Sequence, residues 1–350
     1  MIASPSRFLS LASVVVLAAS CSGGEGSDDA SVSSDGTSTV GGWPACVAPE
    51  PFAPVQSSYG PVTEEYGVGE EEWLVLRAIP ENPRAVLFYF HGTDTSRDDI
   101  KHLEITAGLS VLYDTGIGIV ATSCADRDSK QWDTFDADWD DNADLVHLDL
   151  IRNGLIADGR MTAETPLVFS GFSKGGGFAG FFTEQATRAG WPVAATSIHN
   201  SGGFLDPDTG VPIWWASAAN DPTAGPEEMQ ANFNAYREAG NRCEYHEADE
   251  IAVVPERFLR IYPYTEEQSQ ATFDELVDLA MIDANGVALV DPLNDIESVM
   301  EQYHGASQRT PDTWEVDAQL RVIWATHRYD SRFAYEECLF VSEVVDSFVP

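Results

Sequence analysis

A candidate nucleophile lies in the pentapeptide Gly171-Phe172-Ser173-Lys174-Gly175, between an apolar run at 166–170 and a helical stretch at 178–189. In a G-x-S-x-G sequence between a buried strand and a helix, the turn is so tight that the serine has a strained backbone and small neighbours. Such a turn presents the serine oxygen at the carboxyl edge of a sheet, ready to attack an acyl carbonyl. The alternative is a glycine-rich phosphate-binding turn, but the G-K-[ST] ending of a P-loop is absent here.

Acyl transfer through a serine also needs two N–H donors that converge on the oxyanion of the tetrahedral intermediate. One is expected from Lys174, the residue after the nucleophile, and the other from Thr93 in His91-Gly92-Thr93, which follows the apolar run 85–90. We expect the backbone of this loop to matter, and the His91 side chain to be structural.

The motifs His91-Gly92-Thr93, Gly171–Gly176 and Asn220-Asp221-Pro222, each placed after an expected strand, resemble those of the α/β-hydrolase fold. Within this superfamily the chain resembles secreted esterases of the polyhydroxybutyrate-depolymerase and feruloyl-esterase type, over about 66–239 and again near 320. It departs from their pattern in Lys174, in an insertion, and in the absence of a G-H-x-W motif.

The resemblance implies a catalytic acid at the end of the strand expected at 212–216, where Asp221 stands. A carboxylate at this position orients the catalytic imidazole and stabilises its charged form. Asp206 and Asp208 are competitors, but they precede the strand and have the surroundings of turn residues.

Chain order in this fold places the catalytic histidine after Asp221, which leaves His246, His304 and His327. We favour His327, because it follows the apolar run 320–325, expected to be the last strand, and precedes a closing helix. His246 lies within an expected strand and His304 in an expected loop, and both stay open as alternatives.

The elements that must position these residues alternate along the chain as apolar runs and helical stretches. This alternation predicts an α/β fold with a mostly parallel central sheet and helices on both faces. A helical insertion at about 251–313 is expected before the last strand. The strands are expected at 73–79, 85–90, 117–121, 166–170, 193–198, 212–216, 242–246 and 320–325, and the helices at 98–113, 140–155, 178–189, 227–239, 266–280 and 333–348.

Residues 1–21 resemble a lipoprotein signal peptide, with Arg7, an apolar run and a lipobox-like ending at Cys21. Lipidation is therefore expected at Cys21, and the alternative is an ordinary signal peptide cut near Ala19. Residues 22–45 are polar and small and predict a flexible tether, which leaves 46–350 for the hydrolase domain. The expected location is the outer membrane or surface of a Gram-negative cell, with membrane contact only through the lipid.

Four further cysteines remain, and an exported chain with an even number of them is expected to form two disulfides. Three connectivities are open, and four free thiols are the alternative. The absence of a C-x-x-C spacing makes a zinc site unexpected. These cysteines are Cys46, Cys124, Cys243 and Cys338.

The chain of 350 residues carries 57 Asp and Glu against 19 Lys and Arg, a formal charge of −38. We do not expect the protein to bind nucleic acid, because such binding depends on basic side chains that neutralise phosphates. The aspartates between 136 and 144 resemble a calcium loop only loosely, since glycine and glutamate are missing at the required places. We expect the solvent-exposed start of a helix there. We expect neither a metal nor a cofactor in the protein.

The expected function is therefore ester hydrolysis by a monomeric serine hydrolase, with Ser173, Asp221 and His327 as the catalytic triad. Its substrate is expected to be a small-molecule or polymeric ester. A serine peptidase of the same fold and a catalytically inactive binding lipoprotein are the two alternatives.

Overall fold

The computed structural model describes residues 39–40, 43–66, 73–136, 138–203 and 205–348. Cys21 and the rest of the expected signal peptide lie outside the described residues, as does the tether up to residue 38. Among the described residues, none of the helices has the length and apolar character needed to cross a membrane. The strands are β1 (Thr39–Val40), β2 (Trp43–Pro44), β3 (Val62–Tyr66), β4 (Trp73–Ala78), β5 (Ala85–Phe90), β6 (Ile117–Thr122), β7 (Leu167–Phe172), β8 (Val193–His199), β9 (Ile213–Ala218) and β10 (Cys243–Ala248).

Helices alternate with these strands as far as β10 and then continue alone. The α-helices are α1 (Leu103–Asp114), α2 (Ala143–Ala157), α3 (Lys174–Arg188), α4 (Pro226–Glu238), α5 (Glu266–Asp278), α6 (Ile296–Ala306), α7 (Thr313–Ile323) and α8 (Ala334–Ser347). Short 3₁₀ helices are η2 (Arg97–Lys101), η3 (Pro207–Thr209), η4 (Pro255–Arg260) and η5 (Ser331–Phe333).

The central sheet has eight strands in the order β10-β9-β8-β7-β5-β6-β4-β3. β4 runs antiparallel to both of its neighbours, β3 and β6, and all other neighbours pair in parallel. The carboxyl ends of β5, β7, β8, β9 and β10 therefore meet at one edge of the sheet. This strand order and the single antiparallel strand β4 are those of the α/β-hydrolase fold, so the expected fold class is confirmed.

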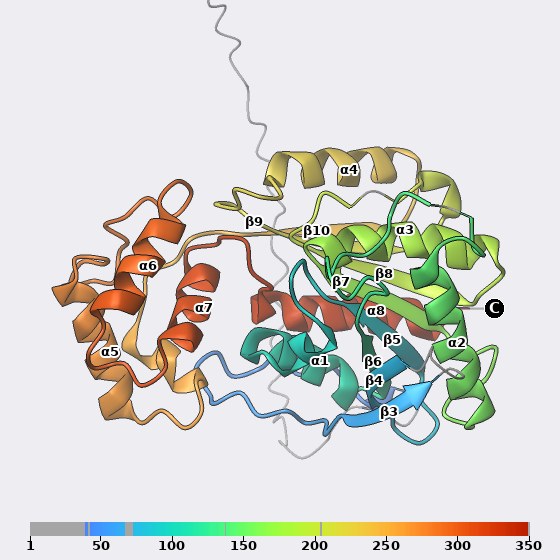
Figure 1. Ribbon diagram of the computed structural model, residues 1–350, viewed down its shortest axis with the longest axis horizontal. Coiled ribbons are helices and arrows are strands. Elements are labelled where there is room, and N and C mark those ends of the chain that lie inside the picture. Colours follow the sequence, from blue (N-terminus) through green and yellow to red (C-terminus); the bar gives the residue numbers. More distant parts are fainter. Residues whose placement is uncertain (1–38, 41–42, 67–72, 137, 204, 349–350) are drawn as a thin grey trace, which may run out of the picture. The chain divides into compact units, whose positions relative to one another are not determined.

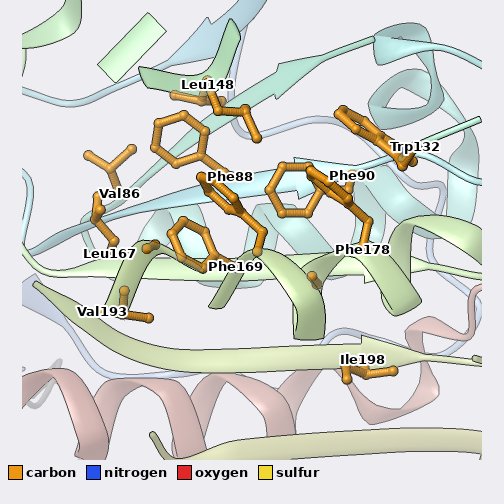
Figure 2. Close-up of a cluster of buried hydrophobic side chains, with 14 of the residues drawn as sticks. Val86, Phe88, Phe90, Trp132, Leu148, Leu167, Phe169, Phe178, Val193 and Ile198 are labelled. Carbon is orange, nitrogen blue, oxygen red and sulfur yellow. The ribbon is translucent and has the colours of Figure 1, made fainter. Parts of the chain in front are cut away.

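Helices cover both faces of this sheet (Figure 1). Because side chains alternate along a strand, Phe88 and Phe90 of β5 pack with α2, α3 and α4 on one face, whereas Leu87 and Tyr89 pack with α1 and α8 on the other. Figure 2 shows Phe88 and Phe90 beside Phe169 of β7, with Phe178 of α3 at the same face. These fully apolar strands are typical of a parallel sheet that is buried on both sides.

The region after β10 differs from the expectation in one important respect. Residues 320–325 do not form a strand, because 320–323 are the end of helix α7 and 324–325 follow it. β10 is the last strand of the described chain, and the helical insertion follows it. Helix α6 and strand β3 were also not expected.

A six-residue apolar run fits a buried strand and a buried helix equally well, and only its surroundings decide between them. Here Val316, Leu320 and Ile323 recur at helical spacing and are all buried in a core of their own with residues of η4, α5 and α6. That core spans Val253 to Trp324, and Figure 1 shows α5, α6 and α7 grouped in orange beside the sheet.

The disulfide expectation is wrong in number. Cys46 is bonded to Cys338, 292 positions further along the chain, whereas Cys124 and Cys243 are free. Cys124 is buried in the loop after β6, and Cys243 begins the edge strand β10. The bridge ties the segment before β3 to helix α8, which packs against α1.

Loss of this bridge is expected to destabilise the fold. In the Cys46→Ser variant the free energy of unfolding should fall by about 3 to 5 kcal/mol, because a long loop in the unfolded chain is no longer closed. Cys243→Ser is the matched control, and we expect a change below about 1 kcal/mol since that thiol is half-buried and free. Urea denaturation of the oxidised proteins measures both. Equal denaturation midpoints for Cys46→Ser and the wild type would contradict this prediction.

Candidate active site

Ser173 lies in a turn between β7 and α3, and its backbone is forced into an unusual conformation. It has φ of 55° and ψ of −125°, while its N–H donates to the carbonyl oxygen of His199 at 3.0 Å. Helix α3 begins at the very next residue, so its first N–H groups, which have no partner within the helix, lie beside the serine. A positive φ is costly for a residue with a side chain, and a strained serine at a sheet edge is a typical functional feature.

The structure brings Ser173, His327 and Asp221 together although more than a hundred residues separate the histidine from either partner. Nε2 of His327 lies 2.8 Å from the Ser173 Oγ, and Nδ1 lies 2.7 Å from Oδ2 of Asp221. Because a carboxylate only accepts, Nδ1 carries the proton and Nε2 is free to accept from the serine hydroxyl. The three side chains thus have the geometry and tautomer of a serine–histidine–aspartate triad.

Asp221 is held on its other side by the backbone that follows it. Its Oδ1 accepts from the N–H groups of Thr223 at 2.7 Å and Ala224 at 2.9 Å. The carboxylate is buried, whereas about a fifth of the His327 side chain is exposed. Asp206, the competing acid, caps the short helix η3 by accepting from the Asp208 N–H. Both competitors are therefore turn residues.

The loop after β5 passes directly beside the nucleophile. A Cβ added at Gly92 would lie 3.6 Å from the Ser173 Cβ, which measures how closely this loop approaches. Thr93 and Lys174, the two expected oxyanion donors, line the same pocket as Ser173 and His327. The side chain of Lys174 reaches Thr134, another residue that lines this pocket, and its Nζ donates to the Thr134 Oγ1 at 3.0 Å.

His91 is buried and structural, in line with the expectation for its side chain. Nε2 of His91 accepts from the N–H of Cys124 at 3.1 Å, and Nδ1 donates to the Gly92 carbonyl oxygen at 2.6 Å. Burial lowers the pKa of His91 to about 4, against a smaller opposing effect of its bond to Gly92. A neutral imidazole therefore joins the β5 loop to the loop after β6.

The other two candidate histidines have different partners. His246 on β10 stacks on the Trp214 ring, with the ring centroids 5.2 Å apart. His304 lies in α6 and bonds Thr313 Oγ1 at 2.9 Å and Asp317 Oδ2 at 3.1 Å. Neither contacts Ser173, so only His327 occupies the position of a base.

The glycines after Ser173 explain how the helix comes so near to the sheet. Gly175, Gly177 and Gly180 also have the spacing G-x-G-x-x-G, but they lie inside α3 and form no separate loop before it. A Cβ on Gly175 would overlap the carbonyl oxygens of Phe90 and His91. This glycine therefore permits the close contact between the oxyanion loop and the nucleophile turn.

Gly175→Ala is expected to damage both the turn and the site. The overlap forces the backbone apart, which typically costs about 1 to 3 kcal/mol, and a displacement near 1 Å can lower turnover about a hundredfold. Gly177→Ala is the matched control for stability, because a Cβ there would come no closer than 3.5 Å to its nearest neighbour, the Ser201 Oγ, which is an ordinary contact. Thermal melting together with ester turnover measures the effect. A Gly175→Ala protein that melts and turns over like the wild type would contradict it.

The triad opens into a pocket of about 570 Å³. Besides Ser173, His327 and the two expected oxyanion donors, it is lined by Thr134, by Phe181 and Glu184 of α3, and by residues after β8 and β9. The segment 200–203, Asn-Ser-Gly-Gly, also lines this pocket and was not expected to do so from the sequence. A polar, glycine-containing turn directly after the apolar strand at 193–198 was the available clue.

The aspartates at 136–144 form turns and a helix start. Asn142 caps α2, and Asp144 is buried and accepts from the N–H groups of Ala125 at 2.5 Å and Asp133 at 2.8 Å. Burial raises the pKa of Asp144 to about 6 in spite of these two bonds. Trp132, just before this segment, is buried and stacks on Phe178, so it is a packing residue. No group of metal-ligating side chains was found in the described part of the chain.

The strand order and the position of Ser173 between β7 and α3 place the chain in the α/β-hydrolase fold class. The sequence matches no protein-family model, and no curated protein matches it. Solved structures that are similar to the chain include an arylesterase, with a TM-score of 0.43 and 10% identity over 56% of this chain and 77% of that protein.

Two further similar structures come from archaea. An esterase of Pyrococcus furiosus has a TM-score of 0.41 and 12% identity over 63% of this chain and 93% of the esterase. An acylaminoacyl peptidase of Pyrococcus horikoshii has a TM-score of 0.41 and 11% identity over 67% of this chain, which spans only 43% of the peptidase. The fold assignment rests on the topology described above.

Proposed function

We propose that the protein is a serine hydrolase that cleaves carboxylic esters through an acyl-enzyme on Ser173. One observation carries the proposal, namely that His327 bridges Ser173 and Asp221 at hydrogen-bond distance on both sides. Three residues from three separate segments meet in this way at the open edge of the sheet, next to a pocket. A purely structural role would not require the strained backbone that Ser173 has in this turn.

In the first half of the reaction, the Ser173 Oγ attacks the acyl carbon while Nε2 of His327 takes the hydroxyl proton. The imidazolium that forms keeps its Nδ1 proton and is stabilised by the buried carboxylate of Asp221. The backbone N–H groups of Lys174 and Thr93 bind the oxyanion. Collapse of the intermediate breaks the ester C–O bond, and His327 returns the proton to the leaving alkoxide as alcohol departs.

In the second half, water enters in place of the alcohol. His327 takes a proton from the water, the hydroxide oxygen adds to the acyl carbon, and collapse of the second intermediate releases the carboxylic acid and restores the Ser173 hydroxyl. The protons and electron pairs balance without any cofactor, and the residues described above carry out every step.

An ester substrate is supported by the sequence motifs that resemble secreted depolymerases and feruloyl esterases, and polymeric or small-molecule esters are both within the proposal. A peptidase of the same fold uses the same triad and differs in the leaving group. The test is turnover of p-nitrophenyl esters of increasing acyl length beside a peptide p-nitroanilide, with Ser173→Ala as the control. Ser173-dependent ester turnover is expected. Turnover of the anilide alone would replace the ester proposal by the peptidase.

We also propose that the protein is exported and lipid-anchored at Cys21, with support from the lipobox-like ending and the polar residues after it. When the full chain is expressed in a Gram-negative host, palmitate labelling and partitioning into detergent are expected, and Cys21→Ala should abolish both. A soluble, unlabelled wild-type protein would show that this part of the proposal is wrong.

A further inference from the structure

The loop that carries His327 has no strand of its own to hold it. In the described chain the sheet ends at β10, and His327 comes 79 residues after that strand's last residue, Ala248, beyond the α5–α7 region. A loop after a helix lacks the backbone ladder that fixes a residue after a strand. An imidazole that must stay within hydrogen-bond distance of two partners needs some other support.

One support comes from Asn220, the residue before Asp221. Its backbone N–H donates to the Ala325 carbonyl oxygen at 2.8 Å, and its side-chain Nδ2 donates to the Trp324 carbonyl oxygen at 2.9 Å. Trp324 and Ala325 are buried, so these bonds satisfy carbonyl groups at the end of α7 that water does not reach. The segment after β9 thereby holds the start of the His327 loop.

The second support comes from Asn200, which directly follows β8. Its Nδ2 donates to the carbonyl oxygens of Thr326 at 3.3 Å and Arg328 at 2.8 Å, the residues on either side of His327. Its backbone N–H donates to the Ala216 carbonyl oxygen at 2.8 Å and so is tied to β9. Carbonyl oxygens only accept, so the amide nitrogen must face them, and this fixes the orientation of the side chain.

Asn200 is suited to this place in two further ways. It has φ of 43°, a region in which asparagine is among the most tolerated residues with a side chain. It is also only 2% exposed, so its bonds to the loop have little competition from water. Its amide is therefore preorganised to hold the two peptide groups that flank the base.

We propose that Asn200 and Asn220 are positioning residues, which fix the His327 loop to the ends of β8 and β9 in place of a strand. The expected effect on activity rests on the proposed function, whereas the expected effect on the position of the loop does not. The carbonyl groups of 324, 325, 326 and 328 are all bonded by these two asparagines. We call this pair of asparagines the clamp. Without the clamp the loop still forms, but the His327 imidazole is displaced from Ser173.

The test is Asn200→Ala in the wild-type and in the His327→Ala background. In the wild type we expect kcat to fall about 10- to 100-fold with little change in KM, since a misplacement near 1 Å costs about a hundredfold. In the His327→Ala background we expect no further loss, because Asn200 acts through that histidine. Hydrogen exchange of the 324–328 amides should become faster while the melting temperature stays close to that of the wild type.

The matched control is Asn241→Ala, since the Asn241 Nδ2 also donates to a backbone carbonyl, that of Pro207 at 2.7 Å, away from the triad. Its kcat and its 324–328 exchange should equal those of the wild type. Asn220→Ala keeps its backbone bond to Ala325 and is expected to have a smaller effect than Asn200→Ala. If Asn200→Ala does not fold, Asn200→Ser and Asn220→Ala are measured by the same comparison.

The proposal is overturned if Asn200→Ala keeps kcat within about twofold of the wild type, or if it causes the same loss in the His327→Ala background. A wild-type protein without esterase activity contradicts the proposed function and not the clamp. In that case the exchange measurement decides, and unchanged protection of 324–328 in Asn200→Ala overturns the clamp.

Discussion

Replacement of His327 by alanine is expected to lower kcat for ester hydrolysis by about 10⁴- to 10⁶-fold, because the members of a triad act as a unit. Without the imidazole, the Ser173 hydroxyl has no base to take its proton, and the leaving alkoxide has no acid to protonate it. His327 is partly exposed, so the fold should survive the change. Steady-state kinetics with a p-nitrophenyl ester, together with a thermal melt, measures the effect.

Two other histidine variants are the controls for this prediction. His246→Ala and His304→Ala remove imidazoles that contact Trp214 and Asp317, and neither contacts Ser173. Both should keep kcat near that of the wild type. If His327→Ala retained near-normal turnover and one of the other two lost it, the assignment of the base would be wrong.

The second large effect is expected at Glu104, which joins the sheet domain to the helical region after β10. Glu104 lies in α1 and is 6% exposed. It forms ion pairs with Arg257 at 3.1 Å and Arg260 at 3.3 Å, both in η4, and it accepts from Gln319 of α7 at 2.8 Å. The two guanidinium groups are themselves buried, and Glu104 is the carboxylate with which both form ion pairs.

Glu104→Ala is expected to lower the free energy of unfolding by about 3 to 5 kcal/mol, because removal of one partner leaves buried charges without compensation. Asp278→Ala is the matched control. It breaks the exposed ion pair of Arg309 with Asp278, and such pairs contribute about 1 kcal/mol or less. Urea denaturation at neutral pH measures both, and equal losses in the two variants would contradict the argument.

The same carboxylate makes stability depend on pH. Burial acts to raise the pKa of Glu104, but the neighbouring arginines, Ser331 and Gln319 outweigh it and lower the pKa to about 2. A pKa that is lower in the folded state stabilises the fold above the unfolded value of about 4.3. That contribution is lost as the pH falls from about 4.3 towards 2. The difference in stability between wild type and Glu104→Gln should therefore shrink over that range.

The sequence was sufficient to predict the parts of the site that follow strands. Ser173 and Asp221 both follow apolar runs, and the carboxyl ends of parallel strands meet at one edge. Ser173 is expected at that edge from its G-x-S-x-G turn, and Asp221 from the resemblance to α/β-hydrolases. His327 was also placed beside them, but for a reason that the structure contradicts. Residues 320–323 are the end of helix α7, and the loop is held by contacts from the residues that follow β8 and β9.

What the sequence could not show depends on contacts between distant segments. Leu320 and Ile323 pack in a core with residues of α5 and α6. The six-residue apolar run alone does not distinguish a helix in this core from a strand in the sheet. The Cys46–Cys338 bridge joins residues near the two ends of the described chain, and it left two of the expected partners free. The bonds of Asn200 reach 126 and 128 residues along the chain.

The most direct test of the central claim is covalent labelling by a fluorophosphonate probe, followed by mass spectrometry of the labelled peptide. An activated serine attacks the phosphorus and displaces fluoride, which leaves a stable phosphonyl ester on its oxygen. We expect stoichiometric labelling of Ser173, no labelling of Ser173→Ala, and much slower labelling of His327→Ala. A folded wild-type protein that is not labelled, or is labelled at another residue, would contradict the assignment of Ser173 as the nucleophile.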